Sequence, residues 1–308
     1  MTISNASAGA ASSPRRSTSP AREVCFVKYY QKGSTDIAAD QMAVALRRRG
    51  VAARSIFARE LAGVRDSVLV FVKRIDLLDL WRAKRAGNAL VVDVQDTVVF
   101  KRGIRYAAAW DGMIFRSRRA LEDFGRGRPG AVLIPQHWDE RYRPRTVPDD
   151  RLRLGFLGDA RSLPFIEPIP GLVAVFDDWF GRAVEFNAHL SVRGTQRELL
   201  YKPNNKVATA AACNAVLLTS RDESARDHLG DDYPFYTDSD RESVLAAIAE
   251  LERRVGGPQW RRALEKLAAI RVDTSLERTT DLYLDYLGRF GELETLAGSE
   301  GEATLARA

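Results

Sequence analysis

Short apolar runs alternate with helix-like patterns along most of the chain, and this alternation limits the fold more than any other feature. Residues 36–50, for example, carry apolar side chains at helical spacing and end at Gly50, a natural helix stop. Further helices are expected at residues 76–87 and 118–125. The strand-like runs of the first half are residues 24–27, 67–73, 89–94, 111–117 and 131–135. Strands that alternate with helices predict a parallel sheet covered on both faces.

The pattern stops in residues 135–150 (PQHWDERYRPRTVPDD), which are rich in Pro, Arg and Asp, and then it restarts. We therefore expect an α/β protein made of two Rossmann-like domains that face each other across a cleft. The predicted bounds are a disordered arm at 1–22, domains at 23–145 and 151–290, and a tail at 291–308. In the second domain, Ser239 and Glu242 have the spacing of a capping box before a helix at 242–255.

The composition is that of a globular protein without structural metal or disulfides. Hydrophobic residues make up 45% of the chain and charged residues 29%. No apolar run approaches the ~20 residues that span a bilayer, so we expect no transmembrane segment and a cytoplasmic location. Two distant cysteines and three scattered histidines indicate neither a disulfide framework nor a metal site: Cys25, Cys213, His137, His189 and His228.

The net charge of +6 suits an anionic ligand, and it is also compatible with peripheral contact to a membrane surface. Most arginines stand among acidic residues, as in ELERRV, and do not form one basic stripe. No RNA- or DNA-binding motif accompanies the charge, so nucleic acid is not an expected partner.

Ligands of open parallel sheets bind beyond the carboxyl ends of the strands. Five predicted loops lie at such ends, and they would line one cleft if the two domains face each other. The loops are residues 28–35, 93–97, 135–139, 158–162 and 193–206.

The last of these loops carries the most informative stretch, KPNNKVATAAACNAVLLTS at residues 202–220. Lys202 and Lys206 come just before an Ala-rich helix, so their charges and the helix dipole can converge on one anion. Small side chains in that helix would let a ligand approach its backbone. The alternative is that both lysines are ordinary surface residues. The full set of predicted binding residues is Lys202, Asn205, Lys206, Arg193, Arg161, Gly158, Gly33 and Ser34. The loop at Gly33 and Ser34 lacks the Walker pattern of a P-loop kinase.

This stretch resembles the late C-terminal-domain motif of GT-B-fold glycosyltransferases of the group 1 type, in which a K-P-x-x-K pattern precedes a small-residue helix. Three further segments resemble other parts of that fold in the right order: VLIPQHWD at 132–139, LGFLGD at 154–159 and DYPFYTDSDRESVLAAIAEL at 232–251. The resemblance extends loosely over roughly residues 23–290. It implies an N-terminal acceptor domain and a C-terminal domain that binds a nucleotide-sugar donor.

The chain departs from the retaining members of that superfamily in two places. They carry a spaced pair of glutamates in this motif, where this chain has Tyr201 and Thr209. Their T-x-H-D element corresponds to residues 93–96, with Gln95 in place of the histidine. The stereochemistry of transfer is therefore left open.

A transfer that inverts the sugar needs a base to accept the proton of the acceptor hydroxyl. Three candidates are Asp96, His137 and Asp36, and Asp96 is the first choice because it ends a strand. Asp36 has an alternative role as a first-turn helix acid, and His137 as a hydrogen-bonding residue between the domains.

The resemblance implies a metal-independent glycosyltransferase that moves a sugar from a nucleotide-sugar donor to an acceptor hydroxyl. The donor would be a co-substrate, and no other cofactor is expected. The acceptor could be a glycan, a lipid-linked molecule or a small molecule. Two alternatives stay open: a sugar-nucleotide epimerase of the same fold, and a catalytically inactive protein that binds glycan or nucleotide.

Overall fold

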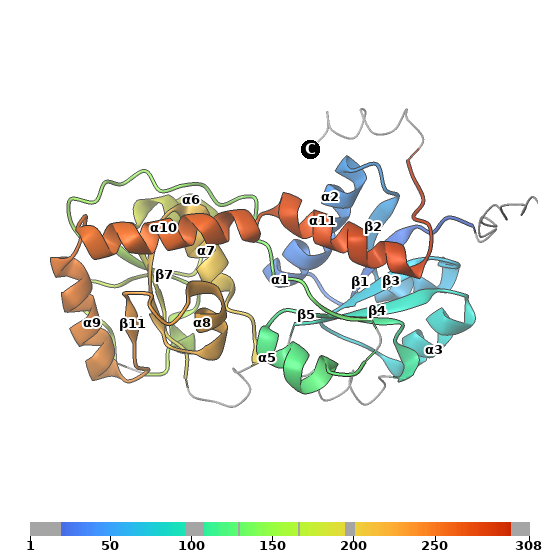
Figure 1. Cartoon of the computed structure of the whole chain (residues 1–308), viewed down its shortest axis with the longest axis horizontal. Helices are drawn as coiled ribbons and strands as arrows, with labels where there is room; N and C mark the ends of the chain where they lie inside the picture. The colour runs from blue at the N-terminus through green and yellow to red at the C-terminus, as the bar shows by residue number, and fades with distance from the viewer. Residues whose placement is uncertain (1–19, 96–107, 129, 166, 195–200, 297–308) are drawn as a thin grey trace, which may run out of the picture.

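The computed structural model describes residues 20–95, 108–128, 130–165, 167–194 and 201–296, and its strands form two separate parallel sheets (Figure 1). The first sheet has the order β2-β1-β3-β4-β5-β6. Its strands are β1 (Val24–Lys28), β2 (Ala53–Phe57), β3 (Val68–Val72), β4 (Ala89–Val94), β5 (Gly112–Phe115) and β6 (Ala131–Leu133). The second sheet has the order β11-β10-β9-β7-β8. Its strands are β7 (Leu154–Leu157), β8 (Val173–Val175), β9 (Ala188–Ser191), β10 (Val216–Ser220) and β11 (Tyr236–Thr237).

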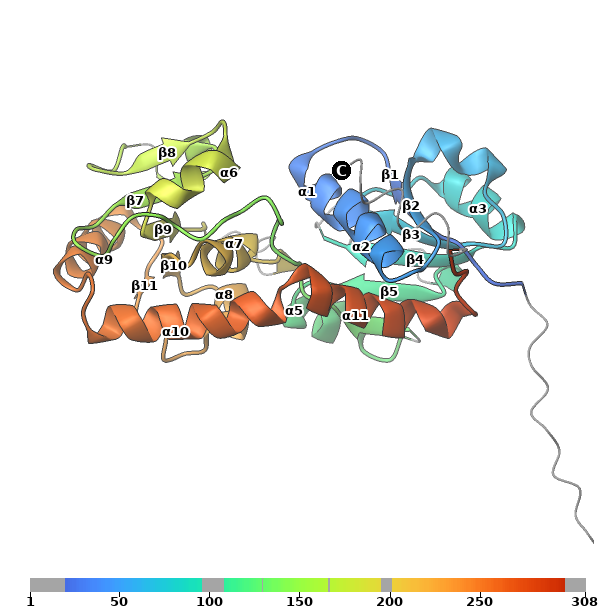
Figure 2. The same cartoon turned by 90° about the horizontal axis from the view of Figure 1, so that it is seen from above.

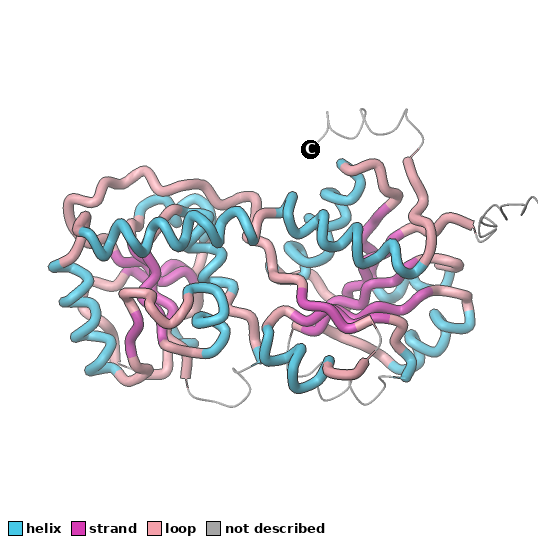
Figure 3. Tube along the Cα trace, in the orientation of Figure 1, coloured by secondary structure: helices cyan, strands magenta, loops and turns pink. Residues whose placement is uncertain are grey.

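Helices cover both faces of each sheet (Figure 3). Those of the first half are α1 (Gly33–Thr35), η1 (Asp36–Gln41), α2 (Met42–Arg48), η2 (Ala58–Gly63), α3 (Leu77–Arg85), α5 (Arg118–Ala120) and η4 (Leu121–Gly125). Those of the second half are η5 (Ala160–Ser162), α6 (Trp179–Arg182), η6 (Ala183–Glu185), α7 (Asn205–Cys213), α8 (Glu223–Leu229), α9 (Arg241–Arg253), α10 (Pro258–Asp273), α11 (Leu276–Leu287) and η8 (Gly288–Phe290). All neighbouring strands in both sheets run parallel, as the alternation of strands and helices predicts.

The last long helix crosses back to the first sheet. Helices α10 and α11 run one after the other along the length of the molecule (Figure 2). Tyr283, Tyr286 and Leu287 of α11 are buried in the same apolar cluster as β1, β3 and α2. The sequence assigns this helix to the second domain, but its apolar face packs on the first sheet. Helical periodicity identifies the apolar face of a helix and not the surface that will cover it.

Other segments also differ from the sequence-based expectations. The sequence-based expectations do not include the edge strand β2. Its sequence ARSIF is not a continuous apolar run, because it contains the exposed Arg54. Helix α9 is capped by the Asp240 carboxylate, which accepts from the amide of Ser243, and not by Ser239. Arg22, within the predicted arm, pairs with Leu293 of the predicted tail. The rest of the arm, residues 1–19, lies outside the described residues.

Candidate functional site

The second sheet contains a switch point between β7 and β9. The chain passes from β7 outward to β8 and then returns to β9 on the other side of β7. Loops that leave such neighbouring strands diverge, and the crevice between them is where doubly wound sheets bind ligands. Gly158 directly follows β7, Arg193 lies two residues beyond β9, and Lys206 occupies the first turn of α7. The fold therefore brings these three predicted residues to one place.

Lys206 holds a buried ammonium with no hydrogen-bond partner among the described residues. Its Nζ atom lies 3.4 Å from the centroid of the Phe156 ring, a contact that favours the charged form. Burial, and then the positive charge of Arg193, lower the pKa of Lys206 to about 7. An unpaired cation in this setting is a strong candidate for binding an anion.

Gly158 keeps the space beside that ammonium open. Its φ of +153° lies in a region that other residues rarely adopt. A Cβ atom at this position would stand 3.4 Å from the Nζ atom of Lys206. A side chain at this position would therefore stand directly beside the Lys206 ammonium.

Arg193 fixes the loop that precedes α7. Its two terminal nitrogens donate to the carbonyls of Lys202, at 3.0 Å, and Pro203, at 2.7 Å. The Ser239 hydroxyl donates to the carbonyl of Arg193 at 2.6 Å, which explains why Ser239 is not the cap of α9. Carbonyls do not neutralise a guanidinium, so Arg193 adds positive charge beside Lys206. Burial lowers the pKa of Arg193.

The start of α7 supplies further donors. Asn204 precedes the helix, and its buried side-chain nitrogen has no hydrogen-bond partner among the described residues. The first turn of α7 contains no acidic residue, so the positive end of the helix dipole is uncompensated there. The sequence motif contains Asn204, but only the fold distinguishes this buried donor from its exposed neighbour Asn205.

The remaining predicted binding residues of the second domain are more exposed. The side chain of Lys202 is exposed, and only its carbonyl is held by Arg193. Arg161 has 87% of its side chain exposed and pairs with Asp159 at 2.6 Å. The cations of Lys202 and Arg161 are thus exposed to solvent, whereas the ammonium of Lys206 is buried.

The first sheet has the same kind of switch point, between β1 and β3. Ser34, in the loop after β1, accepts a hydrogen bond from the Lys73 ammonium at 2.5 Å, and its neighbour Gly33 is exposed. Asp36 pairs at 2.5 Å with Arg141, which also pairs with the buried Asp139 at 2.6 Å. The Asp36 carboxylate is thus tied to the segment that joins the two sheets. Asp96, the first choice for a base, lies outside the described residues.

A buried polar network lies at the carboxyl ends of β4, β5 and β6. The Arg116 guanidinium binds Asp93 through two nitrogens, at 2.8 and 2.7 Å, and donates to the Tyr283 hydroxyl at 2.6 Å. Gln95 donates to the same carboxylate at 2.7 Å. Burial, and then the charge of Arg116, lower the pKa of His137 to about 3, so its imidazole is neutral at physiological pH.

His137 and its neighbour Gln136 are buried, and neither side chain has a hydrogen-bond partner among the described residues. Buried polar atoms are rarely left unpaired in folded proteins. Gln136 and His137 therefore add neutral donors and acceptors beside the Arg116–Asp93 ion pair at the carboxyl edge of the first sheet. The sequence singles out His137 but not Gln136 or Arg116.

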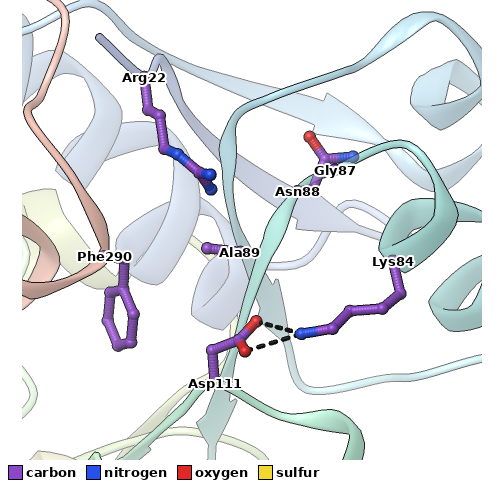
Figure 4. Close-up of a pocket in the computed structure, with 7 residues that line it drawn as sticks. All are labelled: Arg22, Lys84, Gly87, Asn88, Ala89, Asp111 and Phe290. Atoms are coloured by element: carbon purple, nitrogen blue, oxygen red, sulfur yellow. Dashed lines mark hydrogen bonds and ion pairs between the residues drawn. The ribbon is translucent and has the colours of Figure 1, made fainter. Parts of the chain in front are cut away.

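A separate hollow of about 350 Å³ lies at the amino end of β4, the opposite edge of the first sheet (Figure 4). Its Lys84 ammonium is paired with Asp111 at 2.7 Å, and Arg22 also lines the hollow. Among the described residues, no group of three His, Cys, Asp or Glu side chains is placed to hold a metal ion.

No protein-family model and no curated protein matches this chain. Solved structures do match it. A glycosyltransferase from Rickettsia africae ESF-5 is 10% identical with a TM-score of 0.62. The match covers 87% of this chain and 98% of that one. Anabaena Alr3699/HepE, in complex with UDP and glucose, is 10% identical with a TM-score of 0.59. The match covers 87% of this chain and 100% of that one.

The pneumococcal O-GlcNAc transferase GtfA, in complex with UDP and GlcNAc, is 10% identical with a TM-score of 0.55 over 75% of this chain. This chain spans only 58% of the length of that GtfA chain, and 59% of a matched chain of the GtfA/B complex. At such identities the matches concern the fold. They confirm the predicted α/β fold class, and this chain has the GT-B fold of the glycosyltransferases.

Proposed function

We propose that this protein transfers a sugar from a nucleotide-sugar donor to an acceptor hydroxyl. The observation that carries the proposal is the buried ammonium of Lys206 at the β7–β9 switch point, which no described residue pairs. The likeness to proteins solved with UDP supports it, since those proteins have the same fold. The donor is a co-substrate in this proposal, and no separate cofactor takes part.

The diphosphate of a nucleotide sugar gains negative charge as the sugar–phosphate bond breaks. Lys206, Arg193 and the N-terminus of α7 would stabilise that charge, which is the task a metal performs in other transferases. We therefore propose a metal-independent reaction. Lys202, Asn205 and Arg161 would make outer contacts to the donor, because their side chains are exposed.

The acceptor would bind at the carboxyl edge of the first sheet. His137 and Gln136 would hydrogen-bond its hydroxyl groups, because both side chains are buried and uncharged and have no partner in the described part of the chain. An imidazole whose pKa is about 3 is a weak base, and Asp36 is engaged by Arg141. Asp96 therefore stays our proposed base, on the sequence argument alone.

The test is a panel of nucleotide sugars screened for thermal stabilisation, followed by assays of nucleotide release with and without candidate acceptors. Acceptor-dependent release would support transfer. Interconversion of nucleotide sugars without an acceptor would indicate an epimerase, and stabilisation without turnover would indicate a binding protein. No stabilisation by any nucleotide sugar would contradict the proposed donor site.

Two variants make the test specific. Replacing Lys206 by Ala removes a charge-assisted contact, and we expect roughly ten- to a hundredfold weaker donor binding. Lys206→Arg should restore only part of the affinity, since a guanidinium fork is not a point charge. Lys202→Ala is the matched control, and we expect an effect of only about a few fold, because its ammonium is exposed.

A further inference from the structure

We propose that the outer face of α3 is a docking surface for an anionic lipid bilayer. The α3 surface, as we call it, consists of Leu77, Leu78, Trp81, Arg59, Arg65, Arg82 and Arg85. It lies on the end of the first domain away from the second sheet (Figures 1 and 2). The proposal is independent of the proposed function, because it involves none of the residues at the two switch points.

The apolar part of this surface is unusually exposed. Leu77, Leu78 and Trp81 have exposed fractions of 48%, 51% and 56%. Leu80 and Ala83 of the same helix face the core, so α3 is already anchored without these three side chains. Large apolar residues that a helix does not need for its own packing commonly mark an interaction site.

The arginines of this surface have no acidic partner among the described residues, although Arg59 lies over the Phe57 ring at 4.7 Å. Arg59, Arg65, Arg82 and Arg85 line a hollow of about 450 Å³ between η2 and α3. In the part of the chain that the structure describes, none of these four guanidinium groups forms an ion pair or a side-chain hydrogen bond. Asp79, the one acid that lines the hollow, accepts instead from the Tyr29 hydroxyl at 2.9 Å.

Helix spacing places the two kinds of side chain on one stripe. Leu78, Trp81, Arg82 and Arg85 stand at positions i, i+3, i+4 and i+7, which share a helix face. The Arg85 guanidinium lies 4.8 Å from the Trp81 ring centroid. Tryptophan and leucine beside unpaired arginines match the interface of an anionic membrane, where rings and alkyl chains enter the headgroup layer and cations meet phosphate.

The test is co-sedimentation of the full chain with two kinds of vesicle, phosphatidylcholine alone and phosphatidylcholine mixed with phosphatidylglycerol. We expect binding to the mixed vesicles only, weakening as salt is raised. Equal binding to both vesicles, or none to either, would overturn the proposal. Free glycerol phosphate at matched ionic strength should not compete, and effective competition would mean a phosphate site instead of a bilayer surface.

Variants separate the two contributions. The double variant Arg82→Gln with Arg85→Gln should weaken vesicle binding by roughly fivefold for each charge removed. Replacing Leu77, Leu78 and Trp81 together by Ser should weaken it by roughly tenfold or more, with the melting temperature retained because these side chains leave the core intact. Unchanged binding in both variants would overturn the proposal.

Matched controls lie outside the α3 surface. Phe176 is 59% exposed but stands next to Asp177 and Asp178, so Phe176→Ser should leave vesicle binding unchanged. Arg271→Gln with Arg278→Gln removes two exposed charges far from α3 and should have little effect. A loss in these controls as large as in the α3 variants would indicate non-specific attraction by net charge. A single-stranded RNA that binds the α3 surface more tightly than the mixed vesicles do would also contradict the proposal.

Discussion

At the scale of single residues, Lys206 couples donor binding to pH. The free protein holds this lysine with a pKa of about 7, because its ammonium is buried and faces Arg193. A bound diphosphate would raise that pKa, so binding above pH 7 takes up a proton. Donor affinity should then fall as pH rises above 7, by up to about tenfold per pH unit. Calorimetry in buffers of different ionisation enthalpy measures the uptake, and Lys206→Met should abolish it.

The same lysine should lower the stability of the ligand-free protein. Its folded-state pKa is depressed from 10.5 to about 7, so the unfolded chain holds more protons between these values. The unfolding free energy therefore rises with pH through this window, and the full penalty is present below pH 7. We expect Lys206→Met to be more stable than the natural chain at pH 6 by roughly 1–3 kcal/mol, with the difference shrinking toward pH 10. Denaturant unfolding at several pH values measures it, and a less stable Met variant at pH 6 would contradict it.

At the scale of elements, the turn after β7 depends on Gly158. Its φ of +153° strains any other residue, and a Cβ would meet both the Lys206 ammonium and the Phe156 ring at 3.4 Å. We expect Gly158→Ala to destabilise the protein by ~1–2 kcal/mol and to weaken donor binding about tenfold. Gly63→Ala is the matched control, since a Cβ at Gly63 would meet nothing within 4 Å and its φ is not positive. Equal affinities in the two variants would show that the space beside Lys206 is not used.

The start of α9 offers a second test at this scale, because two adjacent residues have separate tasks. Asp240 caps the helix, whereas Ser239 holds the carbonyl of Arg193. Asp240→Ala should cost about 1 kcal/mol of unfolding free energy and leave donor affinity intact. Ser239→Ala should weaken donor affinity a few fold with a smaller loss of stability. Measured melting temperatures and affinities that rank the two variants the other way round would refute this division.

At the scale of the whole molecule, the first domain is completed by the end of the chain. Tyr283, Tyr286 and Leu287 are buried against the first sheet, and the Tyr283 hydroxyl accepts from Arg116. A chain that ends at Asp273 should therefore lose the cooperative unfolding of the first sheet, because three large side chains leave its core. Hydrogen exchange of β1 and β3 measures this, with a chain ending at Leu296 as the control. Full protection of these strands in the shortened chain would contradict the assignment.

The alternation of apolar runs and helical patterns determined the two parallel sheets, and the stretch at 202–220 predicted a ligand site at the carboxyl edge of the second sheet. These signals are local, since strand and helix periods arise within a few neighbouring residues. The tertiary structure alone decided which lysine of that stretch has a buried ammonium, because burial depends on Phe156 and Gly158, which are distant in the sequence. It also decided that α11 covers the first sheet. The apolar face of a helix does not specify which sheet it will pack against. Only the packing of the complete chain selects that sheet.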